Sequence, residues 1–514
     1  MFQLSTNALR ALDLVGAVTR ERTKPAWGFP SRSMERATRG REEEVANHLH
    51  GLLKRGIEFA GAEVLVVPKP KGLRPLSALS FAERTIYRVL TQPLKQELDL
   101  PDRSYERYQA FSKAPLKEER VTHIVRADVS SFYQYIDHDL LHEEIVNQTG
   151  HAGAADSIIA VLHGVNQRRV GLPQLYDPSD WLSEIVIDRV ERNMIREGFA
   201  TFRFNDDFRV ACSSWGEANQ AILKLDSELR PLGLILNDDK TMIQTTSTYQ
   251  EWIDAPEQAW SAIAEELGLD IRTPDWEAIS VYARAISPLV GDEVEEDSNG
   301  EEDEAEDEES RSLWIQAAKR ALEIWLRGKS ANGHDRLRES IEMRLLRQGL
   351  KVLTTARGVE GLEHCKSILT TEQHISHLVG RYMTAAARKD PDGVISRISD
   401  WVSEGFYISD WQRLWLMEPL LLLNPLPDEV IRWVHETSRS SSSVVRGRAL
   451  ALLAYKHLID PAEAAAEIDS LTDSSAKDVT AAIASAMEGS GRLVESLKRQ
   501  GFLSRLVVEY AGSR

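Results

Sequence analysis

The sequence is poor in cysteine, with two in 514 residues. Cys212 and Cys365 lie far apart, without a Cys-x-x-Cys pair or a cluster of histidines, which argues against a disulfide framework and a zinc site. We expect both to be small buried side chains. The sequence also lacks an apolar run close to the roughly 20 residues of a membrane helix, and its first residues show no basic-then-apolar signal pattern. These absences predict a cytoplasmic protein with no membrane partner.

Basic residues do not outnumber acidic ones, and the net charge of −18 at first argues against a nucleic-acid enzyme. Thirteen acidic and no basic residues lie between Asp292 and Glu309, however, so the rest of the chain carries −5. A run of like charge that also contains serine, asparagine and glycine cannot bury enough apolar surface to become ordered. We therefore predict a disordered acidic loop over 291–311. Most of the net negative charge of the chain belongs to this loop.

The segment 201–214 reads Thr-Phe-Arg-Phe-Asn-Asp-Asp-Phe-Arg-Val-Ala-Cys-Ser-Ser. Apolar and polar residues alternate on both sides of Asn205-Asp206-Asp207, which predicts two short strands joined by a tight turn. Two adjacent carboxylates repel each other by several kcal/mol unless a cation lies between them, and a divalent metal is the usual cation. The segment alone also fits a solvated turn, since asparagine and aspartate favour turns for backbone reasons.

A second β-rich run, from Val121 to Asp128, ends in an acid. A strand that delivers one carboxylate beside a hairpin that delivers two provides ligands for two metal ions about 4 Å apart, as in polymerases. We therefore predict that Asp128, Asp206 and Asp207 are catalytic and bind two divalent ions, Mg²⁺ or Mn²⁺.

Further motifs follow in a fixed order. Tyr133 comes five positions after Asp128, Gly-Leu-Pro-Gln spans 171–174, and Gly-Leu-Ile-Leu-Asn spans 233–237, followed by Lys240 and a threonine. Together with the hairpin they resemble the palm motifs of reverse transcriptases. The resemblance covers roughly 64–246. It implies an α+β fold with a reverse-transcriptase-like palm and fingers, and a nucleotidyltransferase that uses deoxynucleoside triphosphates.

The resemblance also implies roles for single residues. The nucleotide-binding residues would be Lys71, Arg74, Arg84, Tyr133 and Gln174. Among these, Lys71 and Arg74 resemble the fingers residues that hold the triphosphate, and Tyr133 resembles the steric gate that excludes a 2′-hydroxyl. Lys240 resembles a catalytic lysine that donates a proton to the leaving pyrophosphate. Without the resemblance, Lys71, Arg74 and Lys240 also fit exposed surface positions.

One motif departs from the family. Reverse transcriptases usually have Gly-Pro after the glutamine of the Gly-Leu-Pro-Gln motif, whereas this sequence has Leu175 and Tyr176. Two bulky residues there predict crowding on the template side of the site.

Strand signals stop near residue 250, and apolar residues at helical spacing continue to the end, punctuated by prolines. We predict an N-terminal helical segment packed on the fingers over 1–60, fingers and palm over 61–250, and an all-α domain over 251–514. The helix pairs suggest a solenoid. We expect Trp411, Trp415 and Trp433 to lie in the core of this domain.

A palm and fingers followed by a large helical extension, with neither a ribonuclease domain nor a basic maturase segment, resembles the bacterial abortive-infection (Abi) reverse transcriptases AbiA, AbiK and the prophage-borne Abi polymerase. The resemblance implies a HEAT-like helical-repeat domain, action against phage infection, homo-oligomers, and DNA synthesis without a template. It also implies priming on the protein, so that the DNA product becomes covalently attached.

Two alternatives remain: a templated, retron-like RNA-directed DNA polymerase, and a catalytically inactive polymerase fold that serves as a scaffold. The priming residue is not identified by the sequence. Tyr105, Tyr108 and Tyr510 rank equally as candidates, and we expect Tyr510 on a free C-terminal tail.

Overall fold

The computed structural model describes residues 1–23, 29–30, 32–69, 72–268, 303–329 and 336–513. Packing divides the chain into two units. The palm unit comprises Met1–Trp27, Gly40–Ala62 and Leu76–Asp254, and the helical unit comprises Gly28–Arg39, Glu63–Pro75 and Ala255–Arg514. The described residues of 28–39 and 63–75 therefore belong to the helical unit.

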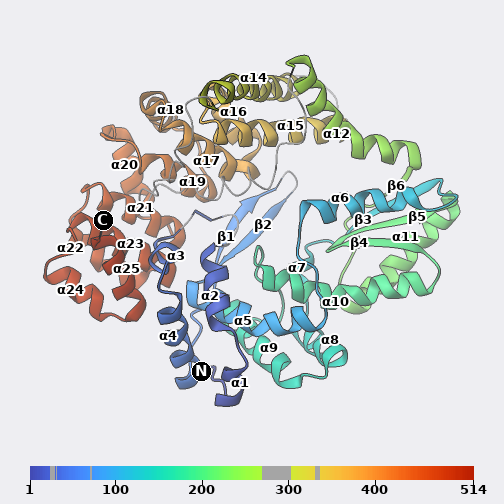
Figure 1. The fold of residues 1–514 in the computed structure, drawn as a ribbon, viewed down its shortest axis with the longest axis horizontal. Helices are drawn as coiled ribbons and strands as arrows, with labels where there is room; N and C mark the ends of the chain where they lie inside the picture. Colours follow the sequence, from blue (N-terminus) through green and yellow to red (C-terminus); the bar gives the residue numbers. More distant parts are fainter. Residues whose placement is uncertain (24–28, 31, 70–71, 269–302, 330–335, 514) are drawn as a thin grey trace. The chain divides into compact units, whose positions relative to one another are not determined.

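The palm unit is built around a four-stranded antiparallel sheet with the strand order β4-β5-β3-β6 (Figure 1). The strands are β3 (His123–Asp128), β4 (Ala200–Phe204), β5 (Asp207–Cys212) and β6 (Met242–Thr245). Both β3 and the β4–β5 hairpin were predicted from the sequence. The central strands β3 and β5 are mostly buried, and α11 (Trp215–Leu229) packs against β3, β5 and β6.

Helices account for the rest of the palm unit. They are α1 (Thr6–Arg10), α2 (Leu14–Thr23), α4 (Glu42–Arg55), α5 (Phe81–Glu97), α6 (Tyr105–Lys113), α7 (Phe132–Tyr135), α8 (His138–Thr149), α9 (Ala152–Asn166), α10 (Asp177–Arg196) and the first part of α12 (Thr246–Glu266). The longest helix that packs on the sheet is α10, which contacts β4, α5, α8 and α11. Helix α10 therefore connects the sheet to the other helices.

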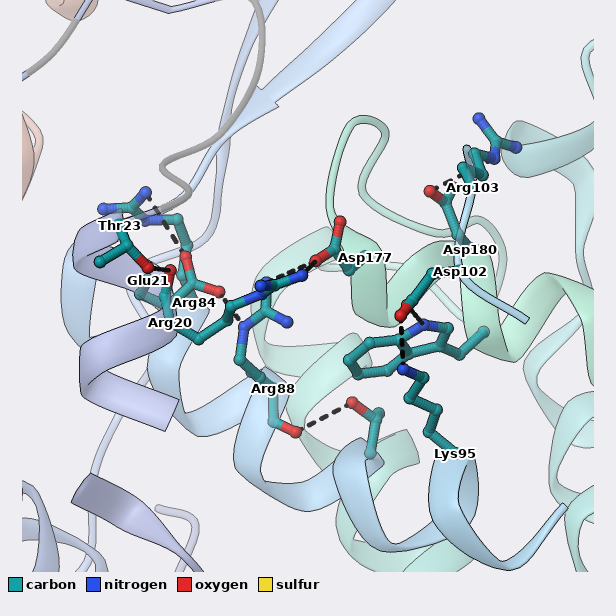
Figure 2. A network of polar contacts seen from close by, with 12 residues as sticks. Arg20, Glu21, Thr23, Arg84, Arg88, Lys95, Asp102, Arg103, Asp177 and Asp180 are labelled. Atoms are coloured by element: carbon teal, nitrogen blue, oxygen red, sulfur yellow. Dashed lines mark hydrogen bonds and ion pairs between the residues drawn. The ribbon is translucent and has the colours of Figure 1, made fainter. Parts of the chain in front are cut away.

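A buried ion network fixes α10 against α2 and α5 (Figure 2). The guanidinium of Arg88 on α5 lies 2.5 Å from Glu21 on α2 and 3.2 Å from Asp177 at the start of α10. Arg88 and Glu21 are almost fully buried, so this pairing is required to offset the cost of removing both charges from water. Three elements that are distant in sequence are thereby held together beside the sheet.

The helical unit contains strand β1, half of strand β2 and a succession of helices. Its strands are β1 (Glu63–Pro68) and the first half of β2 (Leu73–Ala78), and its helices are α3 (Ser33–Ala37), α14 (Asp303–Lys329), α15 (Arg336–Thr355), α16 (Cys365–Thr371), α17 (Ser376–Ala386), α18 (Pro391–Ser403), α19 (Asp410–Leu420), α20 (Asp428–Thr437), α21 (Ser443–Tyr455), α22 (Pro461–Ala466), α23 (Asp473–Ala486), α24 (Arg492–Arg499) and α25 (Phe502–Gly512).

From α15 onward the odd-numbered helices form a stack. Each of α15, α17, α19, α21 and α23 packs against the next odd-numbered helix, up to α25. Trp411 and Trp415 on α19 and Trp433 on α20 are buried, as predicted. The largely helical C-terminal region agrees with the sequence, whereas the assignment to the HEAT type stays a prediction.

Helix α3 is held in the helical unit by buried charge. The Ser33 N–H donates to the carboxylate of Asp478 at 2.7 Å, and Arg448 on α21 donates to Glu418 on α19 at 2.7 Å. Burial raises the pKa of Glu418 and of Asp478, and the neighbouring arginines oppose the rise. This cluster explains why a segment from the N-terminal part of the chain packs with C-terminal helices.

The acidic loop prediction is wrong for part of its range. Residues 291–302 lie outside the described residues, but 303–311 form the beginning of α14. The helix that begins at Asp303 continues into a segment that packs on α15. Within the described residues, no helix is both long enough and apolar enough to cross a membrane.

Candidate active site

Three aspartates lie at one end of the two central strands of the sheet. Asp128 is the last residue of β3, Asp207 is the first residue of β5, and the two are direct partners in the antiparallel register. Phe204 pairs with Asp207, so Asn205 and Asp206 form a two-residue loop. Asn205 adopts φ 53°, which asparagine tolerates well, and such turns suit the twist of a hairpin. The turn places Asp206 next to the two strand-end aspartates.

The loop is tied to β3 through the backbone. The Val129 N–H, which follows Asp128 directly, donates to the carbonyl of Asp206 at 3.1 Å. On the other side, the Asn237 N–H donates to the carbonyl of Asp128 at 2.8 Å. The segment 233–237 and the hairpin therefore hold the end of β3 from both sides, and the predicted motifs come together in space.

Burial and mutual repulsion raise the pKa values of two of these carboxyls. For Asp206 the pKa rises to about 6, chiefly because of burial and then because of the charges of Asp207 and Asp128. Burial also raises the pKa of Asp128, while Lys240 opposes the rise. The energy stored in this repulsion falls when a cation binds, so the cluster favours cations at neutral pH.

A lysine ammonium already neutralises one of the carboxylates. Lys240 Nζ lies 2.9 Å and 3.0 Å from the two oxygens of Asp128, and the Asn237 amide lies 3.3 Å from one of them. The Lys240 side chain is 60% exposed, whereas that of Asp128 is almost fully buried. Lys240 can therefore leave Asp128 without crossing the protein interior.

The donor set suits a divalent cation such as Mg²⁺ or Mn²⁺. Such ions prefer carboxylate oxygens, and this end of the central strands provides three aspartates whose charges repel each other. Among the described residues no group of three acidic, histidine or cysteine side chains is already gathered around one metal position.

Tyr133 lies on the short helix α7, which follows β3 and stands beside the Gly-Leu-Pro-Gln segment. The Leu172 N–H donates to the Tyr133 carbonyl at 2.7 Å. Gly171 adopts φ 93°, and an added Cβ there would lie 3.2 Å from the Gln134 carbonyl oxygen, so this close approach requires glycine. The side chain of Tyr133 is 9% exposed, and that of Gln174 is half-buried.

Of the remaining predicted nucleotide-binding residues, the structure describes Arg74 and Arg84. Arg84 is 3% exposed on α5, and its guanidinium lies 3.6 Å from Glu21, which leaves almost no surface for a nucleotide. Packing of α2 on α5 is the physical reason. Arg74 lies on β2 in the helical unit, where burial and the charges of Arg344 and Arg74 lower the pKa of Arg347. Lys71 lies outside the described residues.

The predicted crowding by Leu175 and Tyr176 is wrong for Tyr176. Its ring is buried, its hydroxyl donates to the Ser77 carbonyl at 2.7 Å, and it accepts from the Leu79 N–H at 3.1 Å. Tyr176 thus anchors the start of α10 to the chain just before α5. Leu175 adopts φ 73°, a turn conformation, and is half-buried.

The three candidate priming tyrosines have different surroundings in the structure. Tyr510 lies within α25 and is half-buried near Arg36, so the expected free tail is wrong at this position. Tyr108 lies on α6, with its ring centroid 5.4 Å from that of Phe204, the residue before Asn205. Tyr105 begins α6.

Two residues that the sequence did not single out contribute to the site. Arg103, just before α6, and Asp180, on α10, form an ion pair of 3.3 Å (Figure 2). The Tyr133 hydroxyl donates to the same Asp180 carboxylate at 2.7 Å. Neither Arg103 nor Asp180 belongs to one of the motifs. Only the three-dimensional packing of the segment before α6 against α10 reveals them.

Residues 67–269 match the family model of the reverse transcriptase (RNA-dependent DNA polymerase). The chain therefore contains a reverse transcriptase domain, which supports an enzyme of the nucleotidyltransferase type, and polymerases of this family generally use divalent metals. No curated protein matches the chain.

Solved structures similar to this chain include telomerases from two Candida species. Apo telomerase from Candida tropicalis is 13% identical, with 70% of this chain and 68% of that chain covered and a TM-score of 0.29. Telomerase from Candida albicans in complex with the TWJ fragment of telomeric RNA is 11% identical, with 68% and 62% covered and a TM-score of 0.31. At TM-scores this low, the likeness says nothing about what this chain binds.

Proposed function

We propose that the chain is a polymerase that transfers nucleotides from deoxynucleoside triphosphates. The observation that carries the proposal is the register of the sheet, which sets Asp128 directly opposite Asp207 with Asp206 at the adjoining turn. The reverse transcriptase domain spans these residues. All three carboxylates are present, which disfavours the alternative of an inactive scaffold.

Each group of the site has a role in this proposal. Asp128, Asp206 and Asp207 would hold the divalent ions, whose chemistry would be to stabilise charge on the attacking and leaving oxygens. Lys240 leaves Asp128 and donates a proton to the leaving pyrophosphate. The ring of Tyr133 lies on the sugar side and excludes a 2′-hydroxyl.

The test is incubation of the purified protein with labelled deoxynucleoside triphosphates and Mg²⁺, with and without an added primer and template, followed by a denaturing gel. Asp206→Asn removes one carboxylate charge and should abolish incorporation. Asp226→Asn is the matched control, since Asp226 pairs with Arg230 on the surface of α11. Wild-type protein that incorporates no nucleotide under any of these conditions would refute the proposal.

We further propose that this polymerase acts in bacterial defence against phage as a template-independent, protein-primed, oligomeric enzyme of the Abi type. The support is the order of the parts, in which a reverse transcriptase domain is followed by a large helical region with stacked helices. Bacteria that express the wild-type chain should then resist phage, and bacteria with Asp206→Asn should not. Protease digestion followed by mass spectrometry should find a nucleotide on a hydroxyl side chain.

One observation favours the templated alternative. Tyr176 was the larger of two residues expected to crowd a template, and its hydroxyl is bound to Ser77 and Leu79 instead. A retron-like enzyme would need an RNA template and would copurify with one defined RNA. Synthesis that stops after ribonuclease treatment and returns with added RNA would favour this function over the Abi type.

A further inference from the structure

Arg103 lies between α5 and α6, in a segment that is hydrogen-bonded to α10 through Asp102. Its neighbour Asp102 accepts a hydrogen bond from the Trp181 indole N–H at 3.1 Å and pairs with Lys95 at 2.7 Å. Figure 2 shows Asp102 beside Lys95, and Arg103 facing Asp180. These contacts hold the backbone beside Arg103 close to α10.

The Tyr133 hydroxyl is the point at which this segment and α10 meet. It donates to a carboxylate oxygen of Asp180 at 2.7 Å and accepts a hydrogen bond from the guanidinium of Arg103. The Arg103 guanidinium also lies 5.5 Å from the centre of the Tyr133 ring. A phenol hydroxyl can donate one hydrogen bond and can also accept, and the Tyr133 hydroxyl does both here.

Arg103 reaches the carboxylate hairpin as well. With the side-chain oxygen of Asn205 facing Arg103, that oxygen accepts hydrogen bonds from Nη2, at 2.6 Å, and from Nε of the guanidinium, and the amide nitrogen donates to Glu184 at 2.7 Å. The forked guanidinium can bind Asp180, Tyr133 and Asn205 together, whereas a lysine ammonium is a single point of charge. Arg103 is 38% exposed at its side chain, so it stands at the boundary between the buried network and solvent.

We propose that Arg103 is the positioning residue that sets sugar selectivity, by holding the Tyr133 ring in one orientation. A steric gate excludes a 2′-hydroxyl only while its ring cannot turn aside. Here rotation of the ring would break charge-assisted hydrogen bonds to both Arg103 and Asp180. The inference rests on the proposed polymerase function and adds to it the residue that makes the gate rigid.

The test compares kcat/KM for deoxynucleoside and ribonucleoside triphosphates. Arg103→Ala should lower the deoxy-to-ribo ratio by about tenfold, which matches the loss of one hydrogen bond to a charged group. Tyr133→Phe, which keeps the ring but removes the hydroxyl, should lower it similarly, and the double variant should fall no further than either single one. Arg192→Ala is the matched control, because Arg192 pairs with Asp188 on the exposed side of α10.

Arg103→Lys keeps the charge but not the fork, and should also lower the ratio while its melting temperature stays close to that of the wild type. An active Arg103→Ala or Arg103→Lys protein with an unchanged ratio would overturn the inference and leave the polymerase function standing. Additive effects of Arg103→Ala and Tyr133→Phe would also overturn it. Wild-type protein without any incorporation would instead signal failure of the proposed function.

Discussion

Replacing Lys240 with methionine should change metal binding and nucleotide incorporation in opposite directions. The ammonium of Lys240 lies 2.9 Å and 3.0 Å from the Asp128 oxygens, so a divalent ion that binds Asp128 must displace it. Methionine has a similar length but no charge. The substitution therefore removes a competing cation from the site without opening a large space.

The magnitude follows from the exposure of the pair. Because the Lys240 side chain is 60% exposed, the ion pair resembles a surface pair worth about 0.5 to 1 kcal/mol. Its loss should tighten Mn²⁺ binding by roughly two- to fivefold, since 1 kcal/mol corresponds to about fivefold in an equilibrium constant. Incorporation should fall, because the proposed proton donor to pyrophosphate is absent.

Mn²⁺ binding can be measured by electron paramagnetic resonance, which reports the free ion, and incorporation on a denaturing gel. The matched control is Lys224→Met, since Lys224 pairs with Glu197 and Glu228 on and near α11. Weaker or unchanged Mn²⁺ binding in Lys240→Met would refute the idea that Lys240 competes for Asp128. An unchanged rate of incorporation would refute its role as a proton donor.

Three other predictions concern sugar selection, pH and stability. Tyr133→Ala removes the ring and should raise ribonucleotide use; an unchanged ratio of ribo- to deoxynucleotide incorporation would mean that the ring only packs. Because the pKa of Asp206 is raised to about 6, a metal ion that binds below that pH must displace a proton. Mn²⁺ affinity should therefore stay constant above pH 6 and weaken by up to about tenfold per pH unit below it. Constant affinity in titrations from pH 5 to 8 would contradict this. Glu418→Ala leaves Arg448 buried without its carboxylate, so it should lower the free energy of unfolding in urea by about 3 to 5 kcal/mol. The control Glu436→Ala, at an exposed position, should change that free energy little. Equal effects of the two substitutions would count against the buried network.

The secondary structure around the aspartates could be predicted because local patterns determine it. Alternation of apolar and polar residues on both sides of Asn205 predicted the hairpin, and β-branched residues before Asp128 predicted the adjoining strand. The structure contains both. The antiparallel register between Asp128 and Asp207 then follows from the pairing of β3 with β5.

Residues whose environment depends on distant packing could not be predicted in the same way. Arg84 was expected to face a nucleotide, but α2 covers it and Glu21 pairs with it. Tyr176 was expected to crowd a template, but its hydroxyl is hydrogen-bonded to backbone groups just before α5. A single sequence gives no signal for such contacts, because the partners are 63 to 99 positions away.

Two predictions were wrong because the segments concerned belong to the ends of helices. Tyr510 was placed on a free tail because it lies near the C-terminus, yet α25 extends to Gly512 and packs on α23 and α3. Acidic residues 303–309 were assigned to a loop because of their charge, yet they begin α14. In both cases packing of the apolar residues in the same helix outweighed a local composition that favours a loop or a tail.

The central claim is that the carboxylates at the end of β3 and at the β4–β5 turn carry out nucleotidyl transfer. The most direct test is Asp206→Asn with Asp207→Asn, assayed for deoxynucleotide incorporation beside wild type and Asp226→Asn. Circular dichroism of each protein would establish that the fold is intact. We predict full activity in the control and none in the double variant. Retained incorporation by a folded double variant would contradict the assignment of the active site.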